Sequence, residues 1–313
     1  MERAGTNDAY SRKGIRPVWC PGCGNYTVLK AVKTALARLA VRPEELVVVS
    51  GIGCSGRFSH YLDAYSLHGT HGRALPTGTG VKAARPELTV LVVGGDGDGL
   101  GIGGGHIAHA ARKNVDMTYL LLDNQIYGLT KGQVSPTTPA GMVTKTTPYG
   151  SLEDAMEPIP VLLSYGVSFV ARSSSLDVRE LSDTITEAMR HPGFSIVYVM
   201  SPCVSFPFLD AKKLRARLSP LPDGHDPTDR AAALSAAYGS PEAAPEEGRR
   251  SPDGPDCLDG PLSSDGTFRT GVFYREVKST LEQRVRAQME RAWTEETVDG
   301  RPESLERILR RYA

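Results

Sequence analysis

The chain has 313 residues, of which 40% are hydrophobic and 23% charged, as in an ordinary globular protein with a sizeable core. Lysine plus arginine equals aspartate plus glutamate at 36 each, so no overall field attracts nucleic acid or an anionic membrane. No stretch approaches the roughly 20 apolar residues that cross a bilayer, and residues 1–16 lack the apolar run of a signal peptide. We therefore expect a cytoplasmic protein that binds neither nucleic acid nor membrane.

Apolar strands and helices alternate along most of the chain, after an arm over residues 1–19 that we expect to be extended. The helices are predicted at 26–40, 101–113, 152–165 and 177–190, and the strands at 46–49, 88–93, 117–122, 167–171 and 194–200. Strands that are apolar throughout predict an α/β fold with a doubly wound, mostly parallel sheet. Cys54, Asp96, Asn124 and Cys203 each follow a strand, where the binding loops of such sheets lie.

The composition changes after about residue 218. Residues 219–266 contain 14 Pro plus Gly in 48, which predicts a mobile insertion with a short helix at 228–238. Residues 267–274 predict a last strand or clasp, and the charged residues 275–312 predict a helical tail lying on a partner. We expect three parts, 1–218, 219–266 and 267–313.

Eight glycines in twelve residues, Gly94 to Gly105, follow the strand at 88–93. A plain strand-to-helix turn does not need so many costly glycines. A dinucleotide fingerprint is satisfied at 99–104, but Asp96 and Asp98 would repel a bare pyrophosphate. Asp96 and Asn124 instead offer hard oxygen ligands for Mg²⁺ carrying a diphosphate. Gly95-Asp96-Gly97, then 26 residues, then Asn124 is similar to the pattern of the thiamine-diphosphate enzymes.

The cysteines suggest a metal or redox centre. Cys20 and Cys23 form a C-x-x-C pair, as in thioredoxin-like sites, but they do not follow a strand. Together with Cys54 and Cys203 they offer four thiolates, which suit either Zn²⁺ or an iron–sulfur cluster. Cys257 lies in the predicted insertion, and we interpret it as a bystander.

A wider resemblance rests on segments that occur together and in order. They are Trp19–Gly24, Gly51–Gly56, His71–Ala74, Gly95–Asp98, Asn124–Thr130, Gly132–Thr138 and Ser201–Cys203. With these segments the chain resembles the β subunits of the 2-oxoacid:ferredoxin oxidoreductases, of the 2-oxoglutarate or pyruvate type. The resemblance is dense over 15–210 and weaker at 225–227 and 271–274, and nothing is carried onto 239–266. It implies a thiamine-diphosphate-binding sheet of the pyrophosphate-domain type.

The resemblance implies three cofactors, namely thiamine diphosphate, Mg²⁺ and one [4Fe-4S] cluster. Mg²⁺ would be held by Asp96, Asn124 and the carbonyl of Ile126. The implied cluster ligands are Cys20, Cys23, Cys54 and Cys203. The implied contacts of thiamine diphosphate are Ile52, Gly53, Cys54, Ser55, His71, Gly97, Asp98, Gly128 and Leu129. Lys131 would meet the substrate carboxylate, and Lys131 and His71 are the implied catalytic residues. The alternative for Lys131 is a solvated loop lysine, and the alternative for His71 is a structural loop histidine.

The implied reaction is oxidative decarboxylation of a 2-oxoacid to acyl-coenzyme A and CO₂, with electrons passing through the cluster to ferredoxin. We find no convincing carboxylate for the aminopyrimidine of the cofactor, so the resemblance implies an α subunit that supplies it, in a heterodimer or a dimer of heterodimers. Two alternatives are a non-oxidative thiamine-dependent decarboxylase or synthase, and a non-enzymatic zinc-binding assembly subunit. The preferred 2-oxoacid is not predicted.

Overall fold

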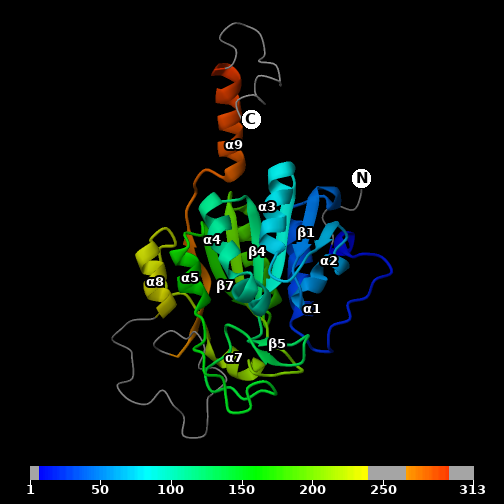
Figure 1. Ribbon diagram of the computed structural model, residues 1–313, viewed down its shortest axis with the longest axis vertical. Helices are drawn as coiled ribbons and strands as arrows, with labels where there is room; N and C mark the ends of the chain where they lie inside the picture. The colour runs from blue at the N-terminus through cyan, green and yellow to red at the C-terminus, as the bar shows by residue number, and fades with distance from the viewer. Residues whose placement is uncertain (1–6, 239–265, 296–313) are drawn as a thin grey trace, which may run out of the picture.

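The uninterrupted apolar runs form the centre of one eight-stranded sheet in the computed structural model, which describes residues 7–238 and 266–295 (Figure 1). The strand order is β2-β1-β3-β4-β8-β7-β10-β9. The strands are β1 Leu46–Ser50, β2 Tyr65–His68, β3 Thr89–Gly95, β4 Met117–Asp123, β7 Phe169–Ser174, β8 Phe194–Met200, β9 Leu218–Pro220 and β10 Phe268–Arg275. All neighbours are parallel except β7 and β10, so the predicted mostly parallel, doubly wound sheet is confirmed.

Helices cover both faces of the sheet, each over its own hydrophobic core. The longer helices are α1 Asn25–Arg38, α3 Ala74–Ala84, α4 Gly104–Lys113, α6 Val178–Arg190, α8 Arg230–Tyr238 and α9 Leu281–Glu295, and the shorter ones are α2 Phe58–Tyr61, α5 Pro158–Ser164 and α7 Ala211–Arg217. One core joins α3, α4, α5, α7 and α8 to the sheet, and the other joins α1, α2 and α6. Successive strand residues face opposite cores, which explains why β4 and β8 are apolar at almost every position and buried throughout.

Residues 218–238 belong to this fold, which corrects the expectation of a mobile segment from residue 219, and the last strand predicted at 267–274 is confirmed as β10. Strand β9 pairs with β10 through Leu218 and Phe268, and β10 pairs with β7. Helix α8 buries Ala233 and Ala237 in the core. Alanine packs closely without a large side chain, so the short helix predicted at 228–238 is confirmed, but its place in the core was not expected. The remainder of the predicted insertion, including Cys257, lies outside the described residues.

Three other expectations need correction. The predicted extended arm contains a 3-10 turn, η1 Asn7–Tyr10, because the Tyr10 hydroxyl is buried and donates to the carbonyls of Leu36 and Val41. The helix predicted at 152–165 is reduced to α5, because the residue before a proline avoids the helical region and Glu157 is extended ahead of Pro158. The helix predicted from residue 101 begins only at Gly104, after the turn η4 Gly97–Ile102, because Gly101 has non-helical backbone angles.

Helix α9 projects from the body of the molecule at the edge opposite the loop that carries the short strand β5 Ile126–Tyr127 (Figure 1). Its start is held at the beginning of β4, where Leu281 N–H donates to the Asn114 carbonyl at 3.2 Å. Val285 and Met289 on this helix are 44% and 67% exposed. The part of the predicted tail beyond residue 295 lies outside the described residues.

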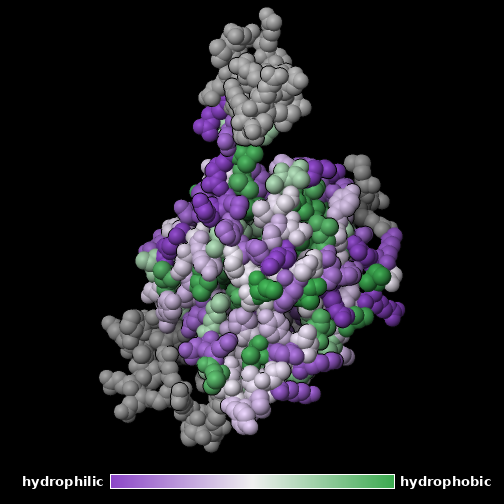
Figure 2. All heavy atoms as spheres, viewed as in Figure 1, coloured by the Kyte–Doolittle hydropathy of each residue, from purple (hydrophilic) through white to green (hydrophobic). Residues whose placement is uncertain are grey.

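The surface seen in Figure 2 is mixed, with small groups of hydrophobic residues separated by polar ones. Over residues 7–238 and 266–295 no helix is both long enough and apolar enough to cross a membrane.

The buried His191 makes stability depend on pH. Burial, together with the nearby Lys278 and Arg275, lowers its pKa to about 4, although Asp116 opposes this. In the unfolded chain the pKa returns to about 6.5, so the unfolded state binds the extra proton between pH 6.5 and 4. The contribution of His191 to stability is therefore complete above pH 6.5 and is lost as the pH drops through this window, by at most about 3 kcal/mol.

We expect His191→Gln to reduce this loss, measured as the difference between the free energies of unfolding in urea at pH 4.5 and pH 7. His109→Gln, at an exposed position of α4, is the matched control and should keep the wild-type difference. An unchanged difference in His191→Gln would contradict the assignment.

Candidate active site

Two neighbouring strands end side by side at one edge of the sheet and place the predicted metal ligands there. Gly95 of β3 pairs with Leu122 of β4, so Asp96 and Asn124 follow adjacent strand ends. A side chain at Gly97 would lie 2.1 Å from the ring of Tyr127, whose hydroxyl donates to the Gly97 carbonyl at 2.9 Å. The glycine therefore lets the two loops touch, which any larger residue would prevent.

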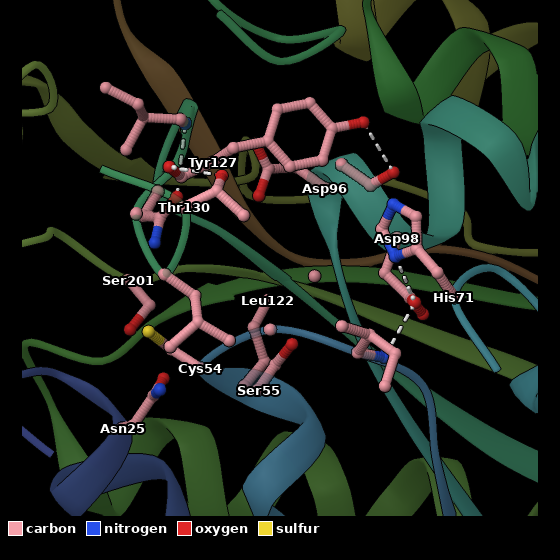
Figure 3. A pocket seen from close by; sticks show the side chains of 18 residues that line it. Asn25, Cys54, Ser55, His71, Asp96, Asp98, Leu122, Tyr127, Thr130 and Ser201 are labelled. Carbon is pink, nitrogen blue, oxygen red and sulfur yellow. Dashed lines mark hydrogen bonds and ion pairs between the residues drawn. The ribbon is translucent and has the colours of Figure 1, made fainter. Parts of the chain in front are cut away.

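The Asp98 carboxylate ties three loops together (Figure 3). Its Oδ1 accepts hydrogen bonds from the Ile52 N–H and the Gly72 N–H, both at 2.8 Å, and lies 3.0 Å from Nδ1 of His71. Asp98 is only 3% exposed, so its carboxylate is solvated by these donors and not by water. Asp98 thus fixes the loops after β1 and β2 relative to the glycine turn.

A pair of buried carboxyl groups lies beneath this edge. Thr137 Oγ1 is 3.2 Å from Asp96 Oδ2 and 2.8 Å from Asp123 Oδ1. Asp123 also accepts from the Gln125 N–H and from the Tyr198 hydroxyl. Burial, and then the neighbouring Asp123, raises the pKa of Asp96 well above its ordinary value, and burial also raises the pKa of Asp123. Two such carboxyl groups favour sharing a proton or binding a cation.

A pocket of about 290 Å³ opens above these groups. It is lined by all nine residues predicted to contact the cofactor, namely Ile52, Gly53, Cys54, Ser55, His71, Gly97, Asp98, Gly128 and Leu129. The predicted magnesium ligands, Asp96, Asn124 and Ile126, line the same pocket. A carboxylate, an amide oxygen and a main-chain carbonyl are hard donors, so this set fits Mg²⁺.

The four predicted cluster ligands line a second cavity of about 260 Å³. Cys20, Cys23, Cys54 and Cys203 are free thiols, and only Cys20 is fully exposed. Burial first, and the neighbouring thiols next, raise the pKa of Cys23 to about 11, so the ionised form requires a positively charged centre. Four thiols around one cavity fit a cysteine-ligated cluster. Among the described residues, no three His, Cys, Asp or Glu side chains converge closely enough for a single ion.

The two cavities share one wall. Cys54, Asn25, Asn124, Gly128, Leu129 and Ser201 line both. Asn25 and Ser201 are buried, and Trp19 Nε1 fixes the Cys54 loop by donating to the Cys54 carbonyl at 2.7 Å. The thiols are therefore separated from the cofactor pocket by a single layer of residues.

Comparison with known proteins places this arrangement in a family. Residues 51–199 match the family model described as "Thiamine pyrophosphate enzyme, C-terminal TPP binding domain". The chain is 40% identical over 276 residues to a 2-oxoacid:ferredoxin oxidoreductase subunit beta of Sulfolobus sp, covering 86% of this chain and 85% of that one. It belongs to this β-subunit family. The predicted family, fold and oxidoreductase class are thereby confirmed.

Two further relatives of the family support this assignment. The chain is 47% identical over 195 residues to the 2-oxoglutarate synthase subunit KorB of Archaeoglobus fulgidus, covering 62% of this chain and 73% of that one. A solved structure is that of 2-oxoglutarate:ferredoxin oxidoreductase from Magnetococcus marinus with 2-oxoglutarate, coenzyme A and succinyl-CoA bound. It shares a TM-score of 0.83 and 37% identity, covering 98% of this chain and 96% of that one.

The two residues predicted to be catalytic in this β subunit lie in different cavities. His71 lines the cofactor pocket beside Asp98. Lys131 lines the thiol cavity, on the loop between β5 Ile126–Tyr127 and β6 Gln133–Val134. Its backbone has φ of 83°, an uncommon conformation for a lysine. The catalytic roles of both residues stay predictions.

Several residues of this β-subunit site were not predicted from the sequence. Asp123 follows an apolar run, which in the sequence indicates only the end of a strand. In the structure its carboxyl group shares the Thr137 hydroxyl with Asp96. Thr137 was quoted only as part of a segment, and Tyr198 is one aromatic residue in a continuous apolar run. Pairing β4 with β8 in register would have placed Tyr198 near Asp123, because the two strands are adjacent.

Removing the Asp98 carboxylate should destabilise the fold, because the Ile52 and Gly72 N–H groups would lose a charged acceptor. We expect Asp98→Ala to lower the free energy of unfolding by about 2–4 kcal/mol, measured by urea denaturation, and Asp98→Asn to lower it less. Asp154→Ala, at an exposed carboxylate, should change it by less than about 0.5 kcal/mol. Equal stability of Asp98→Ala and Asp154→Ala would rule out the bracing role.

Proposed function

We propose that this chain, paired with an α subunit, catalyses coenzyme A-dependent oxidative decarboxylation of a 2-oxoacid in the cytoplasm. Ferredoxin would accept the electrons. The observation that carries the proposal is the shared wall between a pocket with hard oxygen donors and a cavity with four thiols. The names of the relatives support a 2-oxoacid substrate, and 2-oxoglutarate is the first to test.

We assign Mg²⁺ to Asp96, Asn124 and the Ile126 carbonyl, and one [4Fe-4S] cluster to Cys20, Cys23, Cys54 and Cys203. When bound, thiamine diphosphate supplies a carbanion for attack on the 2-oxo carbon, and the cluster supplies one-electron acceptance. The chain's residues position and shield these groups. Asp98 fixes the loops that carry Ile52 and His71, and Trp19 fixes the carbonyl of Cys54.

The carboxylates available in the described lining of the cofactor pocket are Asp96 and Asp98. Asp96 is assigned to the metal, and Asp98 is occupied by the loop donors. The carboxylate that activates the aminopyrimidine would therefore come from the α subunit. We also propose that residues 1–218 hold all the cofactors, with 239–266 as an insertion and 267–313 as a clasp and tail.

Cofactor binding by the pocket should depend on Asp96. Saturating thiamine diphosphate with Mg²⁺ stabilises the folded state by about 2.7 kcal/mol at 100 times Kd, and therefore raises the Tm. Asp96→Ala should abolish this rise in differential scanning fluorimetry, because the metal loses its one carboxylate ligand. Asp154→Ala should keep the full rise. A normal rise in Asp96→Ala would refute the metal assignment.

The cluster assignment is tested with Cys203, which lines the thiol cavity but not the cofactor pocket. In an anaerobically purified α–β complex, Cys203→Ser should lose iron, sulfide and brown absorbance, and should fail to reduce ferredoxin with 2-oxoglutarate and coenzyme A. Its thermal response to thiamine diphosphate should remain. Cys257→Ser, at the predicted bystander, should behave as wild type.

A colourless, zinc-loaded wild-type complex would overturn the cluster assignment. Reduction of ferredoxin with pyruvate or a branched 2-oxoacid, but not with 2-oxoglutarate, would move the substrate assignment within the same reaction class.

A further inference from the structure

The thiol cavity opens to the surface at one corner. Of its four thiols, Cys20 is exposed, whereas Cys23, Cys54 and Cys203 are half-buried. The rim beside Cys20 is apolar, because Val18 is 66% exposed and Val204 is 47% exposed. Ser205, also exposed, donates a hydrogen bond to Cys20 Sγ at 3.2 Å. Electron transfer weakens steeply with distance, so this corner offers the shortest path from the thiols to a protein at the surface.

The charged side chains that line this cavity have one sign. Among the described residues that line the cavity, the charged side chains are Arg57 and Lys131. Arg16 is exposed two residues before Val18. The chain as a whole has equal numbers of acidic and basic residues, so these cations are a local feature and do not reflect an overall excess. A local cationic patch accelerates association with an anionic partner.

We propose that the Cys20 corner, formed by Val18, Arg57, Val204 and Ser205 and preceded in the chain by the exposed Arg16, is the docking surface for an acidic one-electron carrier protein. This inference rests on the proposed function and names where its electron acceptor binds. A small apolar rim with cations in the same cavity suits a transient redox contact, which buries less area than a stable interface. Charge complementarity favours an acidic carrier over a second copy of this neutral chain.

The number of electrons released in each turnover determines how many carriers must dock. Conversion of one 2-oxoacid and one coenzyme A to acyl-coenzyme A and CO₂ releases one proton and two electrons. Each encounter passes one electron from the centre held by the thiols to one oxidised carrier. Two carriers must therefore dock and leave in each turnover, so fast association and fast release are both needed. Electrostatic steering with a small contact area meets both needs.

The test uses the anaerobic α–β complex with two acceptors, a purified ferredoxin of net negative charge and the small dye methyl viologen. Arg16→Glu and Val18→Asp change exposed side chains outside the predicted ligands. We expect each variant to lower kcat/KM for ferredoxin about tenfold through a raised KM, and to leave the rate with methyl viologen unchanged. The wild-type rate with ferredoxin should fall as salt is added, and less steeply in Arg16→Glu.

Arg190→Glu is the matched control, because Arg190 ends α6 just before β8 begins, at the opposite edge of the sheet, and is exposed. Its ferredoxin kinetics should match wild type. If Arg16→Glu and Val18→Asp also match wild type with ferredoxin, the carrier docks elsewhere or the α subunit covers this face, and the proposal is wrong. A colourless wild-type complex that reduces neither acceptor would overturn the proposed function itself, and this docking surface with it.

Discussion

The site depends on one carboxylate oxygen, Asp98 Oδ1, which accepts hydrogen bonds from two loops and belongs to a third. Asp98 Oδ1 is bonded to Ile52, Gly72 and His71, which lie after β1 and β2, and Asp98 itself follows β3. Parallel strands bring these loop starts to one edge but leave the loops free to diverge. The buried charge removes that freedom, because each donor that turned away would leave the carboxylate less well solvated. The resemblance implied that Asp98 contacts the cofactor; Asp98 lines the pocket while its Oδ1 holds the loops, and the cofactor contact stays a prediction.

A second chain of polar contacts crosses the sheet below the pocket. The buried Arg172 guanidinium lies 5.6 Å from the ring of Tyr198, whose hydroxyl donates to Asp123, and Asp123 shares Thr137 with Asp96. Burial lowers the pKa of Arg172 and raises those of both carboxyl groups, so all three charges are costly as they stand. A divalent cation at Asp96 would balance this excess of buried acid, which is a physical reason for a metal at this edge.

Sequence patterns predicted the central sheet well because its strands are buried on both faces, and a strand such as β8 then appears as one almost continuous apolar run. For the same reason the contact of Tyr198 with Asp123 was not predicted. An aromatic residue in an apolar run is expected only to be buried, unless the residue beside it on the neighbouring strand is known. Pro158 and Pro160 were visible in the sequence, but the apolar residues around them dominated the prediction of a longer helix. Helix α8 was placed correctly within two residues, although the segment around it was expected to be mobile. Long-range pairings, here Asp123 with Asp96 and β9 with β10, depend on sheet order, which local patterns do not encode.

The two cavities have opposite electrostatics although they share a wall. Asp96 and Asp98 line the cofactor pocket, whereas Arg57 and Lys131 are the charged groups in the described lining of the thiol cavity. Acidic ligands suit a hard cation, and cations suit a centre ligated by four thiolates, because charge in a low-dielectric site must be compensated locally. Cys54 and Asn124 lie in the wall between the two cavities, so they are close to the acidic groups of one cavity and to the basic groups of the other. The charge of the site thus changes from acidic in the cofactor pocket to basic in the thiol cavity. This arrangement attracts an anionic carrier toward the thiols and away from the cofactor pocket.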